Sequence, residues 1–296
     1  MKIQKEKVTK LTGSADGKKK MGNVVWWSVE RNLAAEGTKT VETFKNLGFP
    51  ENELPIPLEP DIAFGRATKK SSQKLAGWLI RKVFQSEDKI TYAIVREKID
   101  EANEDALYNR EDRVILNRKT GDIDMQKGLD PSKEIKSIYK NSLGKIDNWR
   151  LTDFLLKQMK VSNALQLREM GGIYFVPFQF EDKLSLIEKG LDKVSPETVL
   201  YLLPIYEDAR AQSSLKTAFA EDFKKELASM GDELQKRIEA GATRASTFQN
   251  RLEEFKEIRE RAKAYEDLLH FKAKDVHETI GKLETQVKEA LANAVE

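Results

Sequence analysis

The stretch that decides the fold is FAEDFKKELASMGDELQKRI, residues 219–238, together with the apolar residues that follow it from Phe248 to Val287. The first segment repeats large apolar side chains at spacings of three and four, which places them in one stripe along a helix. That stripe consists of Phe219, Phe223, Leu227, Met230, Leu234 and Ile238. We therefore predict a long amphipathic helix that begins near Glu207 and stops at Ala240-Gly241.

A second apolar stripe follows this stop. It consists of Phe248, Leu252, Phe255, Ala262, Tyr265, Leu269, Val276, Ile280, Leu283 and Val287. The other faces of the segment carry mixed charges, and Ser246 with Gln249 has the spacing of a capping box. Because a short connection forces two such helices antiparallel, the sequence predicts a coiled-coil hairpin over residues 207–296, about 50 Å long.

The two predicted helices differ in length. Folding the hairpin at residues 241–245 brings its first residues opposite about residue 279, so the stripe beyond that point has no partner within the hairpin. The unpaired residues are Ile280, Leu283, Val287 and Leu291. They either pack against the rest of the chain or bind a protein partner or a second copy. We take these four as candidate partner-binding residues.

The rest of the chain divides into a lysine-rich arm, residues 1–22, and a body, residues 23–206. From Gly77 the hydrophobic period changes to two, which predicts an antiparallel meander of three or four strands over residues 78–126. The segment NVVWWSV, residues 23–29, forms a strand or opens a helix; a strand would point Trp26 and Trp27 in opposite directions.

The second half of the body mixes short helices with another hairpin. One helix is expected from about Pro131, with Asp130 as N-cap, and another over residues 147–159. A hairpin should turn at Gly171-Gly172, followed by a helix over 182–191. Residues 198–205 read as a strand ended by Pro204, or as a helix capped by Ser195. The predicted fold class is α+β: an antiparallel β-meander plus a hairpin with short helices, followed by a long antiparallel helical (coiled-coil) hairpin.

Composition excludes several chemistries. Lys plus Arg is 51 and Asp plus Glu is 49, so the chain is neither a polycation nor an acidic solvating segment. There is no cysteine, which removes disulfides, thiolate nucleophiles and Cys-ligated metals. No run approaches the ~18 apolar residues of a membrane span. We therefore expect a cytoplasmic protein that does not contact a membrane.

The remaining residues give little material for catalysis. The segment Gly13 to Lys18 superficially resembles a phosphate-binding loop, but it is one residue short and lacks the Ser or Thr that coordinates magnesium. His270 and His277 lie seven apart on a predicted helix, too distant for one metal ion. Carboxylates such as Asp122 and Asp124 could hold magnesium, although acidic residues are common in turns for backbone reasons. We expect no cofactor, no metal and no catalytic site.

A basic N-terminal half offers a second kind of site. Lysines and an arginine lie beside aromatic residues on the predicted small sheet, an arrangement that suits single-stranded nucleic acid. The candidates are Lys18, Lys19, Lys20, Lys69, Lys70, Lys74, Arg81, Lys82 and Trp78.

The segment LQLREMGGIYFVPF, residues 165–178, precedes the long C-terminal helical region. This Gly-Gly-aliphatic-Tyr-Phe-Val-Pro hairpin resembles that of an uncharacterised family of bacterial and phage proteins. The resemblance implies an origin in a phage or mobile element, hence a bacterial cell as host, and it carries over no activity and no site residue.

Three functions follow from these observations. We expect first a non-enzymatic interaction protein that binds a protein partner or self-associates through its C-terminal coiled coil. The alternative is a nucleic-acid-binding protein that uses its basic N-terminal half. A metal-dependent enzyme with carboxylate ligands is the third and least favoured reading.

Overall fold

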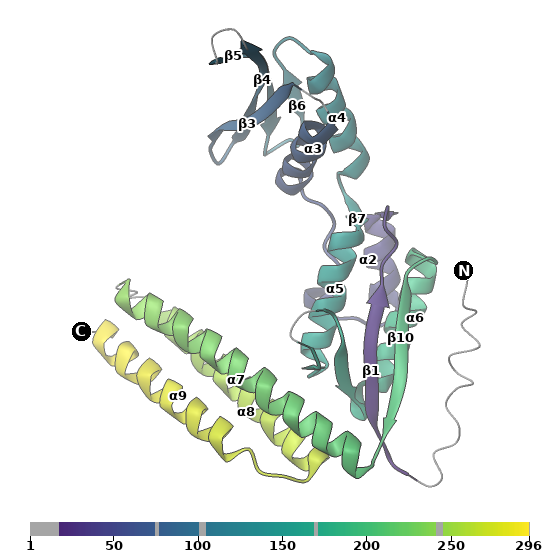
Figure 1. The fold of residues 1–296 in the computed structure, drawn as a ribbon, viewed down its shortest axis with the longest axis vertical. Coiled ribbons are helices and arrows are strands. Elements are labelled where there is room, and N and C mark those ends of the chain that lie inside the picture. Colours follow the sequence, from purple (N-terminus) through teal and green to yellow (C-terminus); the bar gives the residue numbers. More distant parts are fainter. Residues whose placement is uncertain (1–17, 75–76, 101–104, 169–170, 241–244, 296) are drawn as a thin grey trace. The chain divides into compact units, whose positions relative to one another are not determined.

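A computed structural model describes residues 18–74, 77–100, 105–168, 171–240 and 245–295 (Figure 1). The chain is α+β and forms two compact units. The first combines the described part of Met1–Ser28 with Gln158–Glu188 and Val199–Glu296, and the second combines Val29–Lys157 with Lys189–Thr198. The first strand and the C-terminal helices share one unit.

The sheet of the first unit is antiparallel, with the order β10-β1-β9-β8. Its strands are β1 (Lys20–Ser28), β8 (Leu165–Gln166), β9 (Tyr174–Pro177) and β10 (Val199–Tyr206). The strand readings of residues 23–29 and 198–205 are therefore correct. However, β10 continues through Pro204 instead of ending there, because an edge strand tolerates a residue without an amide donor. The predicted hairpin at Gly171 is formed by β8 and β9.

The two tryptophans of β1 point to opposite faces of this sheet. Trp26 stacks on Tyr201 with ring centroids 5.1 Å apart, and Trp27 stacks on Tyr174 at 5.5 Å. After β9 come the short helix η2 (Phe178–Phe180) and α6 (Glu181–Val194), the latter close to the helix predicted over 182–191.

The C-terminal region holds three helices where the sequence predicted two. They are α7 (Ala209–Glu239), α8 (Ala245–Leu269) and α9 (Lys274–Val295). The second apolar stripe is broken after Leu269, and α9 folds back to contact both α7 and α8 (Figure 1). The continuous second helix of the predicted coiled-coil hairpin is therefore wrong, and the region is a three-helix bundle.

The break comes from a turn that carries no glycine. His270 adopts a left-handed backbone conformation with φ of 52°, and the amide of Phe271 donates to the carbonyl of Glu266 at 3.1 Å. This is the Schellman pattern that ends many helices. The Glu266 carboxylate also accepts from the Ala273 amide at 2.6 Å and lies 3.2 Å from His277 Nε2. One buried carboxylate thus fixes the start of α9 against the end of α8.

The residues predicted to lack a partner within the hairpin are buried, because this turn folds α9 back onto α7 and α8. Ile280, Leu283 and Val287 are buried in the bundle core, and Leu291 packs against it. A β-carbon placed on Gly231 of α7 would lie 3.4 Å from Leu283 Cδ2, which shows that α9 passes directly beside this residue of α7. The stripe is therefore not unpaired, because the turn after Leu269 returns α9 along α7 and α8.

The second unit contains a small two-stranded pairing and a larger sheet. In the former, β2 (Ala34–Glu36) pairs with β7 (Lys145–Asp147) beside α2 (Gly37–Asn46), and α5 (Asn148–Val161) follows β7 directly in the chain. Part of α5 belongs to the first unit. Between α2 and the larger sheet the chain forms the short helix η1 (Glu51–Glu53). The elements α2 and β2 were not predicted.

The larger sheet, here the meander sheet, consists of β3 (Trp78–Gln85), β4 (Lys89–Asp100), β5 (Asp105–Asn117) and β6 (Ile123–Met125) in sequential antiparallel order. This confirms the meander predicted over residues 78–126. Helices α3 (Pro60–Lys74) and α4 (Asp130–Ser142) contact the sheet on one face. Leu129 is the N-cap of α4, so Asp130 is its first residue and not its cap.

Candidate nucleic-acid interface

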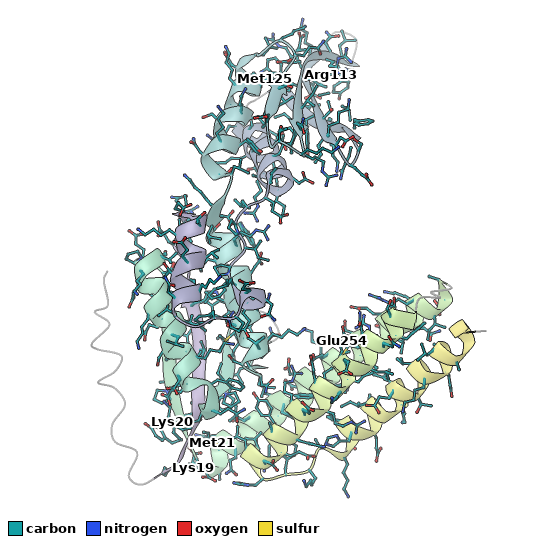
Figure 2. The ribbon with its side chains drawn as sticks, turned by 180° about the vertical axis from the view of Figure 1, so that it is seen from behind. Lys19, Lys20, Met21, Arg113, Met125 and Glu254 are labelled. Atoms are coloured by element: carbon teal, nitrogen blue, oxygen red, sulfur yellow. The ribbon has the colours of Figure 1, made fainter. Side chains whose placement is uncertain are left out.

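One face of the meander sheet is buried and the other is open. Ile90, Ile94, Val114 and Leu116 point into the core formed with α3 and α4. The residues between them point to the opposite face, since side chains alternate along a strand. We call this opposite surface the open face; Figure 2 labels Arg113 on β5 and Met125 on β6 within the sheet.

The centre of the open face is a row of three paired residues. Arg81 pairs with Ala93, and Ala93 pairs with Arg113 on the next strand. Directly paired residues of an antiparallel sheet point to the same face. Ala93 is only 3% exposed, because the side chains around it are larger. The row therefore places two guanidinium groups on either side of a small residue, about 10 Å apart at the backbone.

On β3, β4 and β5 the neighbouring row carries an aromatic ring and no charged side chain. Phe84 pairs with Thr91, and Thr91 pairs with Ile115. Phe84 is 48% exposed, and the Lys89 ammonium lies 5.2 Å from the centre of its ring. A cation at this distance over an aromatic face is attracted by the ring. This contact independently places Phe84 on the same face as Lys89.

Two bulges determine which residues reach the open face. On β3 the register shifts between Lys82 and Phe84, which leaves Val83 unpaired. On β5 it shifts opposite Ile94 and Val95, which leaves Glu111 unpaired between Arg110 and Asp112. A bulge inserts one residue and re-aims the side chains beyond it. Phe84 therefore joins Arg81, and Arg110 joins Arg113, although each pair is three residues apart.

The basic residues of the open face are not neutralised by their neighbours. Among the described residues, neither Arg81, Arg110 nor Arg113 forms an ion pair, and Arg113 Nε is buried without a hydrogen-bond partner. The carboxylates nearby lie at the margins: Glu97 further along β4, and Asp124 paired with Ile115 on β6. Glu111 adds a carboxylate in the bulge beside Arg110. The central row itself carries no acidic residue.

Asp112 holds the strand that carries two of these arginines. It is buried and accepts hydrogen bonds from Ser132 Oγ at 2.6 Å and from three backbone amides, those of Arg113, Lys127 and Leu129, at 2.7 to 3.0 Å. Burial raises the pKa of Asp112, but these hydrogen bonds outweigh it and lower the pKa to about 2. The carboxylate thus ties β5 to the segment before α4.

The structure separates most of the residues predicted for nucleic acid. Lys69, Lys70 and Lys74 lie on α3, which covers the opposite face of the meander sheet, and Lys74 pairs with Glu134 at 3.2 Å. Trp78 is half-buried against the core. Lys82 pairs with Tyr92, which contacts the same core, so its position belongs to the covered side. Of the predicted residues on this module, Arg81 alone lies on the open face.

The arm residues belong to the other unit. Lys20 pairs with Glu181 and lies 5.9 Å from the ring of Phe178, and Lys19 is exposed next to it (Figure 2). Lys18 is exposed as well. Residues 1–17, which include most of the segment likened to a phosphate-binding loop, lie outside the described residues.

Sequence reasoning missed Phe84, Lys89, Arg110 and Arg113. Alternate spacing from Arg113 back along the strand assigns Arg110 to the covered face, and the same counting from Arg81 misplaces Phe84. The signal that could have found them is the break in alternation, RKVF in residues 81–84 and REDR in residues 110–113. In a regular strand, residues two apart share a face and residues three apart do not. The end residues of each stretch are three apart, so they share a face only if the strand contains a bulge.

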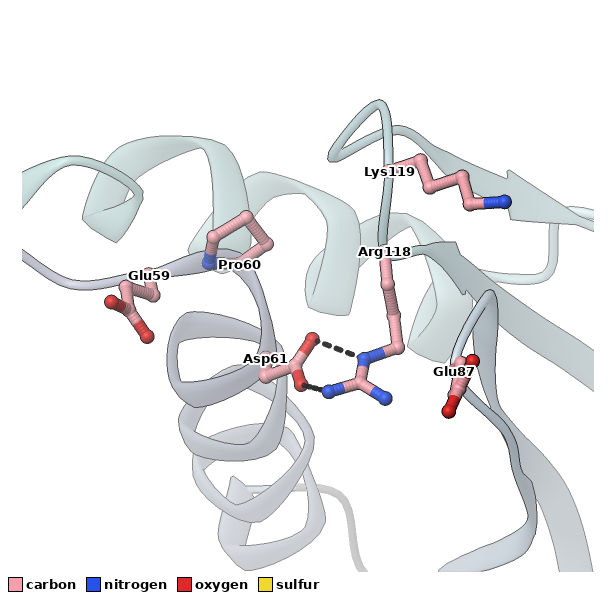
Figure 3. Close-up of a pocket in the computed structure, with 6 residues that line it drawn as sticks. All are labelled: Glu59, Pro60, Asp61, Glu87, Arg118 and Lys119. Atoms are coloured by element: carbon pink, nitrogen blue, oxygen red, sulfur yellow. Dashed lines mark hydrogen bonds and ion pairs between the residues drawn. The ribbon is translucent and has the colours of Figure 1, made fainter.

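A shallow depression beside this module is occupied by an ion pair. Asp61 at the start of α3 and Arg118 after β5 form two contacts, Nε to Oδ1 at 3.2 Å and Nη2 to Oδ2 at 2.6 Å (Figure 3). Arg118 Nη1 also donates to the carbonyl of Ser86 at 2.7 Å. These contacts neutralise the two charged groups and join two turns, so we assign the depression a structural role.

The histidine and carboxylate candidates are spread over separate elements. His277 contacts Glu266, and His270 lies 3.6 Å from Glu207, both at the α8–α9 turn. In the ranges that the structure describes, no three His, Asp or Glu side chains gather as metal ligands. Asp122 follows the turn before β6, and Asp124 is exposed on that strand. Asp100 ends β4 and Asp105 begins β5, and residues 101–104 between them lie outside the described part.

None of the described helices is both long enough and apolar enough to cross a bilayer. Neither a curated protein nor a solved structure shows significant similarity to the chain. A family profile, in contrast, matches residues 20–296, nearly the whole sequence, including the hairpin at Gly171 and the three-helix bundle. The chain belongs to a family of unknown function, DUF6744.

Proposed function

We propose that the protein binds nucleic acid through the open face of the meander sheet, without catalysing a reaction on it. The observation that carries this proposal is the row Arg81–Ala93–Arg113, with both guanidinium groups on an uncovered face and without ion pairs among the described residues. Arg110 and Lys89 extend the positive charge along the two strands.

Arginines in this arrangement suit phosphate. A guanidinium presents several donors in a planar fork that matches two phosphate oxygens, and it keeps its charge at all physiological pH values. A cation that pairs with a carboxylate of its own chain must give up that contact before it binds a ligand. Because these arginines have no such contact, their binding to phosphate has no competing internal ion pair.

The proposal differs from an interaction through the C-terminal helices. That interaction, with a protein partner or a second copy, stays a prediction, but Ile280, Leu283 and Val287 are inside the bundle and cannot serve as its surface without rearrangement. An origin in a phage or mobile element also stays a prediction. Both are compatible with binding of nucleic acid by the other unit.

The test is the salt dependence of binding. Fluorescence anisotropy of a labelled oligonucleotide should give a log Kd that changes linearly with log salt. With four cations in contact with a single strand, the slope is about 3, so Kd should rise roughly 50-fold between about 50 and 200 mM salt. The double substitution Arg81→Ala/Arg113→Ala should lower the slope by about half.

A charge-matched control lies on the covered side of the same module. Lys69→Ala/Lys70→Ala removes two exposed cations from α3 and changes the net charge by the same amount. This variant should keep the wild-type slope within about a fifth. If the two double variants lower the slope equally, binding follows net charge and the open face is not the site. Absence of binding at about 50 mM salt would remove the proposal.

A further inference from the structure

The open face carries apolar surface in addition to its cations. Phe84, which points to this face, is 48% exposed. Leu79 on β3 and Ile115 on β5 point to the same face and are half-buried. Surface of this kind finds no complement in a phosphate backbone, so it points to a ligand that offers an apolar flat group together with its phosphates.

Single-stranded nucleic acid offers this combination and a duplex does not. In a duplex the base faces are stacked inside and the phosphates line the outside. In a single strand the bases are free to stack on aromatic side chains while the backbone follows a positive groove or surface. A ring and two guanidinium groups on adjacent rows of one sheet match the second arrangement.

The bulges bring the two chemistries together. Without an unpaired Val83, a residue three positions after Arg81 would point into the core side. The same holds for Arg110 relative to Arg113. The Lys89 ammonium lies over the Phe84 ring, so a further cation stands next to the aromatic group on this face.

We propose that the open face binds single-stranded nucleic acid, with a base stacked on Phe84 and the adjoining phosphates on Arg81 and Arg113. The bulges at Val83 and Glu111 bring these side chains to the same face. The inference rests on the proposed function and adds the class of nucleic acid and the residue that selects it. Phe84 is the stacking residue, and Arg81 and Arg113 are the phosphate-binding residues.

The experiment compares one oligo(dT) of about 16 nucleotides with its oligo(dA) duplex by fluorescence anisotropy at about 50 mM salt. Wild-type protein should bind the single strand more tightly than the duplex. The substitution Phe84→Leu keeps an apolar side chain but removes the ring, and it should weaken single-strand binding roughly tenfold while leaving duplex binding unchanged. Circular dichroism and thermal melting of the variant verify that it folds.

A matched aromatic exists elsewhere in the chain. Phe178 is 51% exposed and has the Lys20 ammonium 5.9 Å from its ring, so Phe178→Leu removes an equivalent exposed ring outside the meander sheet. That variant should bind the single strand like wild type. Equal weakening by both substitutions would contradict the role of Phe84.

The outcomes separate the inference from the function beneath it. Equal affinity for single strand and duplex, insensitive to Phe84→Leu but reduced by Arg81→Ala/Arg113→Ala, overturns the single-strand inference and leaves nucleic-acid binding in place. No binding to either form overturns both. Binding of an acidic protein in place of either oligonucleotide, abolished by the double arginine variant, assigns the face to a protein and also overturns both.

Discussion

Arg110 and Arg113 point to the same face of the meander sheet although three residues separate them along β5. In a regular strand that spacing puts two side chains on opposite faces. The unpaired Glu111 makes the difference, and the buried Asp112 beside it fixes the strand to the segment before α4. The positive surface of this sheet is therefore a product of an irregularity that a buried carboxylate helps to hold.

Removing the charge of Asp112 should destabilise the fold. Asp112→Asn keeps the size of the side chain but turns one acceptor oxygen into a donor, so at least one of its four hydrogen-bond donors loses its acceptor. We expect a loss of about 1–3 kcal/mol in the free energy of unfolding, measured by urea denaturation at neutral pH. Asp124→Asn, on the exposed strand β6, is the control and should change stability by less than about 0.5 kcal/mol. A stable Asp112→Asn variant would show that the hydrogen bonds do not anchor this segment.

The same carboxylate predicts an acid dependence. The pKa of Asp112 is about 2 in the folded protein and has an ordinary value of 3.8. A lowered pKa means that the charged form favours the folded state, so its contribution is complete above about pH 4 and falls as the pH decreases toward 2. Wild-type protein should therefore lose more stability than Asp112→Asn over this interval. Parallel decreases for the two proteins would assign the acid sensitivity to other carboxylates.

The turn between α8 and α9 offers a stabilising substitution. His270 holds φ at 52°, a conformation that costs a β-carbon-bearing residue about 1 kcal/mol relative to glycine. Its exposed contact with Glu207 is worth little by comparison. His270→Gly should thus raise the free energy of unfolding by up to about 1 kcal/mol, whereas His270→Ala should not. A decrease for the glycine variant would mean that the left-handed turn is not the native one.

Burial of the apolar stripe of α9 can be tested by comparing two isoleucine-to-alanine substitutions. Ile280 is fully buried in the bundle, and Ile238 near the end of α7 is 37% exposed. Ile280→Ala should cost about 2–4 kcal/mol and Ile238→Ala clearly less. If Ile280 instead contacted a second copy of the chain, Ile280→Ala would leave the monomer as stable as wild type. It would also lower the mass of the assembly measured by light scattering. That result would restore the partner-binding role of Ile280, Leu283, Val287 and Leu291.

Period and turn chemistry were enough to predict the meander sheet, the β8–β9 hairpin and the helical end of the chain. The sequence did not reveal the third helix, because the stop at His270 uses a left-handed residue other than glycine and a carboxylate, Glu266, four positions upstream. The spacing of the apolar stripe does not change at His270, because Leu269, Val276 and Ile280 continue the same helical period in the sequence. Only the return of α9 onto α7 shows that the stripe serves two different contacts.

The open face escaped prediction for a related reason. Alternation assigns every second residue to one face, and it fails from the first bulge onward. Arg81 was named with Lys82 as a basic residue beside aromatic residues, whereas Phe84, which follows the bulge on β3, and Arg110, which lies beyond the one on β5, were not named. Lys69, Lys70 and Lys74 were grouped with Arg81 by proximity in sequence, but α3 carries them to the covered side.

The most direct test of the proposed site is to locate the bound strand. Ultraviolet cross-linking of a photoreactive oligo(dT) to the full chain, followed by mass spectrometry of the proteolysed complex, identifies the peptides in contact with it. The proposed site predicts cross-links in β3 and in the peptides that carry Lys89 and Arg113, and their loss in Arg81→Ala/Arg113→Ala. Cross-links concentrated on α3 around Lys69 and Lys70, or on Lys18 to Lys20, with none on the meander strands, would contradict it.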